Sequence, residues 1–392
     1  MKIGMVSEFF YPQPGGISEH IRALSRELRL RDHEVTVITS EIRGSVEERD
    51  PRVIRIGKSQ PVHYNGAVSR VTYGWKLGPK MAAMLKAENF DVLHIHNPHM
   101  PTLPLIALRE TLCPVVGTFH SNNPWDLGST LFHPVMRPWV NKTNIRIAVS
   151  PTALRAASRH YPGEYRVVPN GVDYDFFAEA ACRAETQFPG LDNAKKKILF
   201  VGASVRRKGL PYLLKAFIQL RETRDDLELV VVGDGPDRRR MQNRVPSALR
   251  DDVHFVGSVP RAKLAEYYAA ADIFCAPSTG QESFGMVLLE AMAAGIPVTG
   301  FAIDGYTDVV RTGEEGILVR PKDVKALAES LAYFLDSREE RNRFARHGQV
   351  KARAHDWSEI ARQVEAAYHE ALGAPHQVEL PFTEKAEAAK AK

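Results

Sequence analysis

The chain has 392 residues, of which 44% are apolar and 25% are charged, so it is long enough for two globular domains of ordinary composition. It contains no uninterrupted apolar segment of roughly 18 residues and it starts on a predicted strand, so we expect a cytoplasmic protein without a transmembrane helix or signal peptide. The three cysteines are scattered singly, which excludes a disulfide framework and a zinc knuckle.

The positive charge lies in the first half of the chain. Residues 1–170 contain 21 Lys and Arg and 14 Asp and Glu, which gives this part a net charge of +7. Residues 171–392 contain 31 Lys and Arg and 33 Asp and Glu, which gives a net charge of −2. A basic surface can bind nucleic acid, but the chain lacks the aromatic and basic modules that such proteins use. We therefore expect no nucleic-acid partner.

The first forty residues show a strand, loop, helix, strand pattern. A β-rich run at residues 2–6 precedes a loop with Gly15 and Gly16, then apolar residues at helical spacing (Ile17, Ile21, Leu24 and Leu28) and a second strand at 35–38. This order predicts a parallel sheet, in which ligands bind beyond the carboxyl ends of the strands. The glycine loop lacks the patterns of a dinucleotide site or a P-loop.

Two further predicted strands, at residues 90–97 and 114–121, end in polar side chains. His94, His96 and His99 raise the question of a metal site. Alternation along a strand places His94 and His96 on one face without any metal, and no cysteine or carboxylate cluster accompanies them, so we expect no metal. His120 stands at the carboxyl end of its strand, where a catalytic residue belongs, although the backbone alone can satisfy a histidine there.

The strand and helix pattern begins again near residue 196. A basic loop, Arg206 to Lys208, follows the strand at 198–201 and suits phosphate binding. The stretch APSTGQESFGMVLLEAMAAGIPV, residues 276–298, is a loop that leads into a helix. We place Glu282 and residues 283–285 in the first turn of that helix, where free N–H groups hold phosphates. Glu290 lies in a run too apolar for a solvated face and needs a partner, whereas Glu282 can also be a simple helix cap.

The pattern E-S-F-G-x-V-x-x-E followed by A-M-A-A-G-x-P-V resembles the donor-site signature of retaining GT-B glycosyltransferases of family four. The segments MVSEFFYPQPGGISEHI, YNGAVSRV, DVLHIHNP, VVGTFHS and PNGVD are also similar to bacterial phosphatidylinositol mannosyltransferases. This resemblance covers about residues 1–372. It implies an α/β fold of two Rossmann-like, doubly wound domains that face a cleft: residues 1–172 with a returning helix at 357–373, residues 190–356, and a disordered tail at 374–392.

The resemblance implies metal-independent transfer of a hexose, with retention, from GDP-mannose to a lipid-linked or polyol hydroxyl such as that of phosphatidylinositol. The alternatives are a UDP-sugar donor and an inactive sugar-binding paralogue. It assigns catalysis to His120, Arg206, Lys208 and Glu282; donor binding to Gly16, Gly202, Arg206, Lys208, Ser283, Phe284, Gly285, Met286, Val287 and Glu290; and acceptor binding to Gly15, Ser18, His99 and Ser121.

The chain departs from the family pattern at two donor-site positions. Ala203 follows Gly202 where the family has arginine, so either Arg206 supplies the arginine of this loop or the loop has no equivalent of it. Arg261 stands after G-x-V, where related mannosyltransferases place an acidic residue that accepts from guanine. Because a guanidinium only donates, this change leaves the donor base open between guanine and uracil.

The segment from Gln60 to Lys86 combines basic and aromatic residues, as interfacial segments do. We expect peripheral, reversible binding to an anionic membrane at the inner face of the cytoplasmic membrane. An amphipathic helix packed on its own domain would have a similar sequence. The membrane residues that we propose are Arg70, Trp75, Lys76, Lys80 and Lys86.

Overall fold

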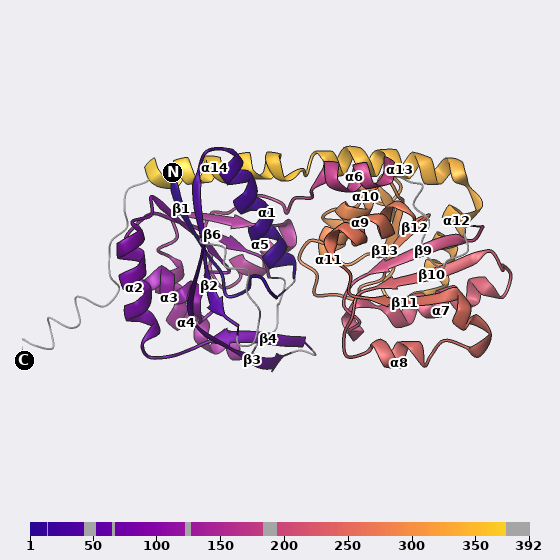
Figure 1. Cartoon of the computed structure of the whole chain (residues 1–392), viewed down its shortest axis with the longest axis horizontal. Coiled ribbons are helices and arrows are strands. Elements are labelled where there is room, and N and C mark those ends of the chain that lie inside the picture. The colour runs from indigo at the N-terminus through magenta and orange to yellow at the C-terminus, as the bar shows by residue number, and fades with distance from the viewer. Residues whose placement is uncertain (14, 43–51, 65–66, 122–126, 183–193, 374–392) are drawn as a thin grey trace, which may run out of the picture. The chain divides into compact units, whose positions relative to one another are not determined.

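The structure is a computed structural model that describes residues 1–13, 15–42, 52–64, 67–121, 127–182 and 194–373. The chain divides into two compact units, Met1–Pro169 with Ile360–Lys392, and Asn170–Glu359. The first boundary falls inside the P-N-G-V-D segment. Each unit contains its own sheet with helices packed around it (Figure 1). The predicted tail at 374–392 lies outside the described residues.

Unit 1 is built on an eight-stranded sheet in the order β4-β3-β2-β1-β5-β6-β7-β8, in which only the β3–β4 pair is antiparallel. Its strands are β1 (Lys2–Val6), β2 (Glu34–Glu41), β3 (Val53–Tyr64), β4 (Ala67–Thr72), β5 (Val92–His96), β6 (Val115–Phe119), β7 (Ile145–Ala148) and β8 (Arg166–Val167). Its helices are α1 (Gly16–Leu30), α2 (Leu77–Glu88), α3 (Leu103–Glu110), α4 (Leu127–Val140) and α5 (Pro151–Ser158).

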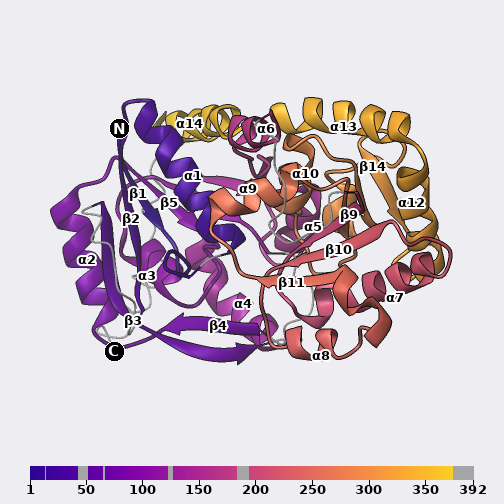
Figure 2. The ribbon, with the colours of Figure 1, turned by 45° about the vertical axis from the view of Figure 1, so that its right-hand side comes forward.

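The central strands β5 and β6 of unit 1 are buried because helices cover both faces of a parallel sheet. Every residue of β5 and β6 is buried. The segment from Gln60 to Lys86 begins differently from the single helix that we considered. It starts as the β3–β4 hairpin, which Figure 2 shows at the edge of the sheet, and it becomes helical only at Leu77.

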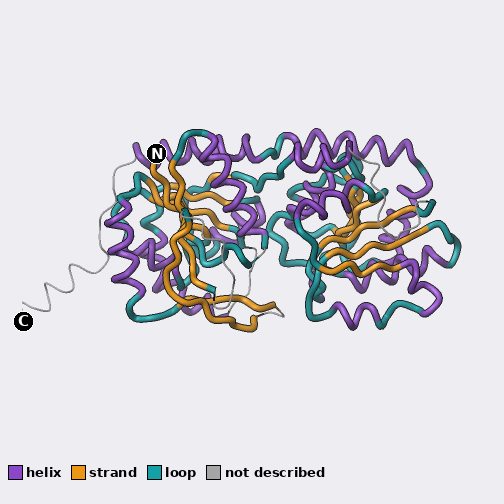
Figure 3. Tube along the Cα trace, viewed as in Figure 1, coloured by secondary structure: helices purple, strands orange, loops and turns teal. Residues whose placement is uncertain are grey.

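Unit 2 has a six-stranded, fully parallel sheet in the order β11-β10-β9-β12-β13-β14. Its strands are β9 (Lys196–Val201), β10 (Leu227–Val232), β11 (Val253–Gly257), β12 (Ile273–Ala276), β13 (Val298–Phe301) and β14 (Gly316–Val319). Its helices are α6 (Tyr174–Cys182), η1 (Arg206–Lys208), α7 (Leu210–Arg221), α8 (Arg238–Gln242), η2 (Ser247–Asp252), α9 (Arg261–Ala269), α10 (Met286–Ala293), α11 (Asp304–Thr307), α12 (Val324–Asp336) and α13 (Arg338–Arg353). Figure 3 shows these strands between layers of helix.

The last helix, α14 (Trp357–Gly373), carries the chain back to unit 1, as the sequence predicted. Several polar contacts attach it there, among them ion pairs from Arg31 and Arg166 and a hydrogen bond from His33. Glu365 accepts from the Arg31 guanidinium at 2.8 Å, and the Tyr368 hydroxyl lies 2.7 Å from Nδ1 of His94. At the start of the helix Trp357 covers Gly171, where a Cβ atom would lie 2.5 Å from the indole ring.

Both sheets reverse their strand order at one point. In unit 1 the order changes direction between β1 and β5, and in unit 2 between β9 and β12. The loops that leave the carboxyl ends of such neighbouring strands run in opposite directions and leave a crevice, which is where doubly wound sheets bind ligands. The predicted site residues follow these four strands and their neighbour β6.

Candidate active site

In unit 1, the loop after β1 leads into the amino terminus of α1. Gly15 and Gly16 are both exposed, and the first intrahelical bond runs from the Glu19 N–H to the Gly15 carbonyl at 2.9 Å. The N–H groups of residues 16–18 therefore form the open first turn of a 15-residue helix. With no side chain at either glycine, an anionic ligand can approach this positive helix end closely.

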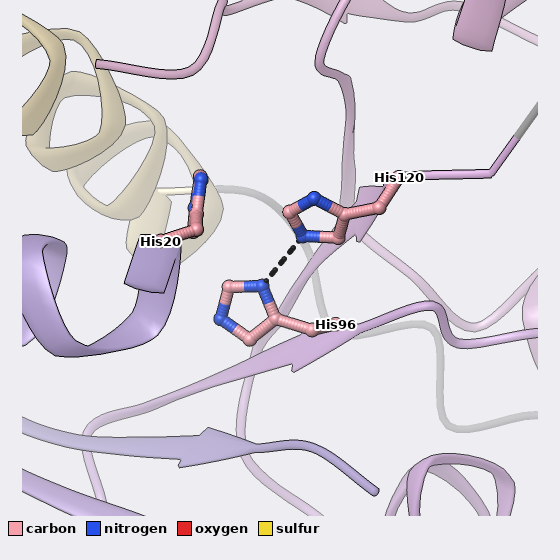
Figure 4. A group of neighbouring side chains, drawn as sticks. All are labelled: His20, His96 and His120. Carbon is pink, nitrogen blue, oxygen red and sulfur yellow. Dashed lines mark hydrogen bonds between the residues drawn. The ribbon is translucent and has the colours of Figure 1, made fainter. Parts of the chain in front are cut away.

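His120 follows β6 beside this helix end and is 7% exposed (Figure 4). Its backbone N–H donates to Oδ1 of Asn97 at 2.9 Å, and its ring Nε2 lies 3.0 Å from Nδ1 of His96. Burial first, and then the neighbouring imidazoles, hold the pKa of His120 well below its usual range. The ring is therefore a neutral imidazole fixed by another side chain, and the backbone alone does not satisfy it.

His94 and His96 lie on one face of β5, as strand alternation predicted, and their rings stack with centroids 4.3 Å apart. His94 uses both ring nitrogens, toward the Tyr368 hydroxyl and toward Oγ1 of Thr118, each at 2.7 Å. Burial lowers its pKa to about 3. His99 does not join them, because its ring stacks on Phe119 with centroids 5.6 Å apart.

The residues predicted to bind the acceptor differ in accessibility. Ser18 is buried and donates its hydroxyl to the Gln13 carbonyl at 2.8 Å, so it shapes the glycine loop from inside. His99 is half-buried, and burial together with His133 and His160 lowers its pKa to about 4. Ser121 is half-buried and Gly15 is exposed. Their roles in acceptor binding stay predictions.

In unit 2, the basic loop after β9 forms the short helix η1. Lys208 Nζ and Arg207 Nη1 both contact Oε1 of Glu282, at 2.8 and 2.6 Å. Arg206, which we expected to supply the guanidinium, has an exposed side chain, and the arginine that reaches this carboxylate is Arg207. Sequence reasoning recognised the basic loop but not this residue, because three consecutive basic residues carry no signal of which one turns inward.

The loop that carries Glu282 is held against η1 by close backbone contact. Gly209 has φ 75°, and a Cβ atom there would lie 1.7 Å from the Pro277 carbonyl oxygen. Gly305 likewise leaves no room, since its Cβ would lie 2.2 Å from the Glu282 carbonyl oxygen. These glycines bring the basic loop and the Glu282 loop together at the reversal point of the sheet.

The helix after this loop starts later than we predicted. α10 begins at Met286, after Gly285 at φ 100°, so residues 282–285 form the turn before the helix and are not its first turn. The first intrahelical bond runs from the Leu288 N–H to the Gly285 carbonyl at 2.9 Å. The open N–H groups are therefore those of Met286 and Val287, while Phe284 is buried in the core.

Glu290 has the partner that its apolar surroundings require. It lies about one turn into α10, and the buried Tyr268 hydroxyl donates to its Oε2 at 2.8 Å. Burial and then the carboxylate raise the pKa of Tyr268 well above its usual range, so the phenol keeps its proton. Glu290 is half-buried, which leaves part of the carboxylate for a ligand.

Arg261, the residue that replaces the family's acidic position, contacts neighbouring side chains of unit 2. It forms an ion pair with Asp173, and its guanidinium lies 4.6 Å from the centroid of the Phe176 ring. The residue is therefore part of the contact between α9 and α6. Because the guanidinium is held by these contacts, the presence of arginine at this position is a weaker argument against a guanine base in the donor.

Two doubly wound units with the predicted site residues at both reversal points match the architecture of the GT-B glycosyltransferases, and the comparisons with known proteins agree on this fold. The family model for glycosyltransferase family 4 matches residues 14–176, and the model for group 1 glycosyl transferases matches residues 183–351.

A phosphatidyl-myo-inositol mannosyltransferase of Mycobacterium tuberculosis is 36% identical over 388 residues, which cover 97% of this chain and all of that protein. Sucrose-phosphate synthase from Thermosynechococcus elongatus superposes with a TM-score of 0.76 at 25% identity, over 95% of this chain and 100% of that one. An Anabaena protein solved with UDP and glucose superposes with a TM-score of 0.74 at 20% identity, over 94% and 99%, and supports the fold. The chain belongs to glycosyltransferase family four and is an enzyme of the hexosyltransferase class.

Proposed function

We propose that this enzyme transfers mannose from GDP-mannose to a hydroxyl of phosphatidylinositol, with retention of the anomeric configuration and without a metal cofactor. The observation that carries the donor half of the proposal is the Arg207–Glu282–Lys208 cluster beside the open end of α10. The mannosyltransferase relative supports the sugar and the acceptor.

The donor-side groups match what departure of a nucleoside diphosphate requires. As the bond between the anomeric carbon and the phosphate oxygen breaks, negative charge grows on the pyrophosphate. Lys208, Arg207 and the N–H groups of Met286 and Val287 are fixed donors for that charge. Glu282 holds both cations in place before the donor binds.

Within the described residues, the side chains that form hydrogen bonds or ring contacts with His120 are Asn97, His96 and His20, and none of them is a carboxylate that could act as a nucleophile. We infer that the acceptor oxygen attacks from the face that the phosphate leaves, and that its proton passes to the departing phosphate. His120, whose burial keeps it neutral, positions the transferred hexose and does not act as a base. Arg206 retains a proposed auxiliary role near the phosphates.

The main alternative is a UDP-sugar donor, because the acidic residue that reads guanine in similar enzymes is replaced by Arg261. A thermal-shift screen of GDP-mannose, GDP-glucose, UDP-glucose and UDP-N-acetylglucosamine separates the two. We expect GDP-mannose to raise the melting temperature most. A larger increase in melting temperature with a UDP-sugar favours the alternative donor. If a nucleotide sugar binds but is neither transferred nor slowly hydrolysed, the result favours an inactive paralogue. DNA serves as the negative control.

Replacing Glu290 with glutamine is expected to weaken nucleotide binding while the fold is kept. The amide oxygen can still accept from the Tyr268 hydroxyl, but it loses the charge that strengthens bonds to the ribose hydroxyls. A loss of about 1.5–3 kcal/mol corresponds to roughly 10- to 150-fold in Kd for GDP. Calorimetry measures it, with Tyr268→Phe as the control that removes the orienting hydroxyl. Unchanged affinity in Glu290→Gln would contradict the assignment.

For membrane attachment we propose the predicted residues Arg70, Trp75, Lys76, Lys80 and Lys86, to which the structure leads us to add Tyr73. Trp75 is 88% exposed and Tyr73 71% exposed, and Lys76 Nζ lies 4.9 Å from the Trp75 ring centroid. In contrast, Leu77 and Met81 are buried in the core of unit 1, so core packing explains why these two residues are apolar. Core packing does not explain the exposed rings of Tyr73 and Trp75. In the part of the chain that the structure describes, no helix is long and apolar enough to cross a bilayer.

Changing Lys76, Lys80 and Lys86 to serine is expected to release the protein from anionic vesicles. Each basic residue near an anionic surface contributes about 1 kcal/mol, so the triple variant loses on the order of 100-fold in partitioning at low salt. Sedimentation with neutral and anionic liposomes measures this loss. The matched control changes Lys325, Lys351 and Arg353 of unit 2 to serine. Equal, salt-independent partitioning of all three proteins would refute the proposal.

A further inference from the structure

Three histidines from separate elements of unit 1 converge beside the glycine loop. His20 lies in the second turn of α1, His96 ends β5 and His120 follows β6, and Figure 4 shows their rings turned toward one another. One ring nitrogen from each lies within 4.8 Å of the others, and all three residues are buried. The three that converge in space are not the three that are close in sequence, because His94 and His99 have other contacts.

The spacing within this cluster is close to that of metal ligands. In a tetrahedral zinc site with Zn–N bonds of about 2.0–2.1 Å, two ligand nitrogens are about 3.3 Å apart. Nδ1 of His96 and Nε2 of His120 are 3.0 Å apart and share one proton in a hydrogen bond. Replacing that proton with a metal ion requires these two rings to separate by only a few tenths of an ångström, and His20 to move inward.

The environment favours pre-oriented ligands. All three imidazoles are buried, so their surroundings restrict the movement of the rings. His94 stacks on His96 and spends both its own nitrogens on Tyr368 and Thr118, which fixes the orientation of the His96 ring without competing for a metal. A ligand ring that is already oriented loses less conformational freedom when a metal ion binds, which favours binding.

We propose that His20, His96 and His120 form a binding site for a transition-metal ion such as Zn²⁺, with three protein ligands and one open position. Three imidazole nitrogens select Zn²⁺, Co²⁺, Ni²⁺ and Cu²⁺ over Mg²⁺, Ca²⁺ and Mn²⁺, which prefer oxygen. Metal binding removes His120 from the sugar-positioning role. A metal ion bound here would therefore inhibit an enzyme whose chemistry needs no metal. This inhibition rests on the proposed function, but the binding of the metal ion does not.

Cobalt titration of the untagged, full-length protein tests the site without any substrate. We expect the visible absorption of tetrahedral Co²⁺ to appear at a stoichiometry of one, to be bleached by Zn²⁺ and to be unaffected by Mg²⁺. Removing a residue that only hydrogen-bonds to a metal ligand weakens metal binding roughly 10- to 100-fold. His96→Gln and His20→Gln each remove a ligand, so each should weaken Co²⁺ binding by more than this. His369→Gln removes an exposed imidazole of the same unit and should bind as wild type does.

Two sets of outcomes would overturn the site. Either wild type gives no tetrahedral spectrum, or both cluster variants, with wild-type circular dichroism, bind as tightly as wild type. Reversible inhibition by Zn²⁺, relieved by a chelator and absent with Mg²⁺, tests the consequence for activity. Tight Co²⁺ binding in a protein that transfers no mannose would leave the metal site standing and contradict only the proposed function.

Discussion

Replacing Lys208 with alanine is expected to lower kcat about 150-fold, which corresponds to about 3 kcal/mol of transition-state stabilisation. The ammonium is 2.8 Å from Glu282 and 15% exposed, so it is already fixed and partly desolvated where the leaving pyrophosphate develops charge. Because that charge grows mainly as the bond breaks, KM for the donor should change far less than kcat. Steady-state kinetics with the donor found in the screen measures both constants.

The neighbouring arginines provide matched controls for this prediction. Arg207→Ala removes a guanidinium that contacts the same carboxylate oxygen, whereas Arg206→Ala removes an exposed one. We expect the Arg207 variant to lose more activity than the Arg206 variant. If Lys208→Ala raises only KM and leaves kcat intact, the lysine contributes ground-state binding and its proposed role in the chemical step is wrong.

Replacing Gly209 with alanine is expected to destabilise unit 2 by more than about 3 kcal/mol. A left-handed backbone costs an alanine about 1–2 kcal/mol, and overpacking adds a further 1–3 kcal/mol. Here the new Cβ atom would lie 1.7 Å from the Pro277 carbonyl oxygen, a backbone atom that no side-chain rotation can move away. The loop of Lys208 and the loop of Glu282 would be forced apart, so donor binding should be lost together with stability.

Gly313→Ala is the control that separates strain from overlap. Gly313 also has positive φ, at 93°, but a Cβ atom there would meet nothing within 4 Å. Thermal unfolding should therefore show a melting temperature lower by a few degrees for Gly313→Ala and by about 6–12 °C for Gly209→Ala. Equal losses in the two variants would show that overlap with Pro277 contributes nothing.

The sequence predicted the architecture because its signals are local. Buried parallel strands such as β12 (IFCA) and most of β10 (LELVVV) are rich in apolar residues, and each strand is followed by polar or glycine-rich residues that mark its carboxyl end. The alternation of strands and helices implied two doubly wound sheets, and the returning helix α14 followed from the resemblance.

The site contacts that were missed are all set by long-range packing. Tyr268 supports Glu290 from another helix, and Arg207 was indistinguishable from Arg206 by pattern. His20 joins His96 and His120 only because α1 packs beside the ends of β5 and β6. The start of α10 was misplaced because a glycine at φ 100° ends the preceding turn, which composition does not reveal.

The most direct test of the account is the NMR spectrum of the lipid formed when the protein is incubated with GDP-mannose and phosphatidylinositol vesicles. We predict a phosphatidylinositol that carries one mannose in the α configuration, the configuration of the donor, formed in the presence of a chelator. A β-linked product would contradict the retaining mechanism. Absence of any mannosylated lipid, from folded protein that binds GDP-mannose, would contradict the proposed acceptor and the central claim.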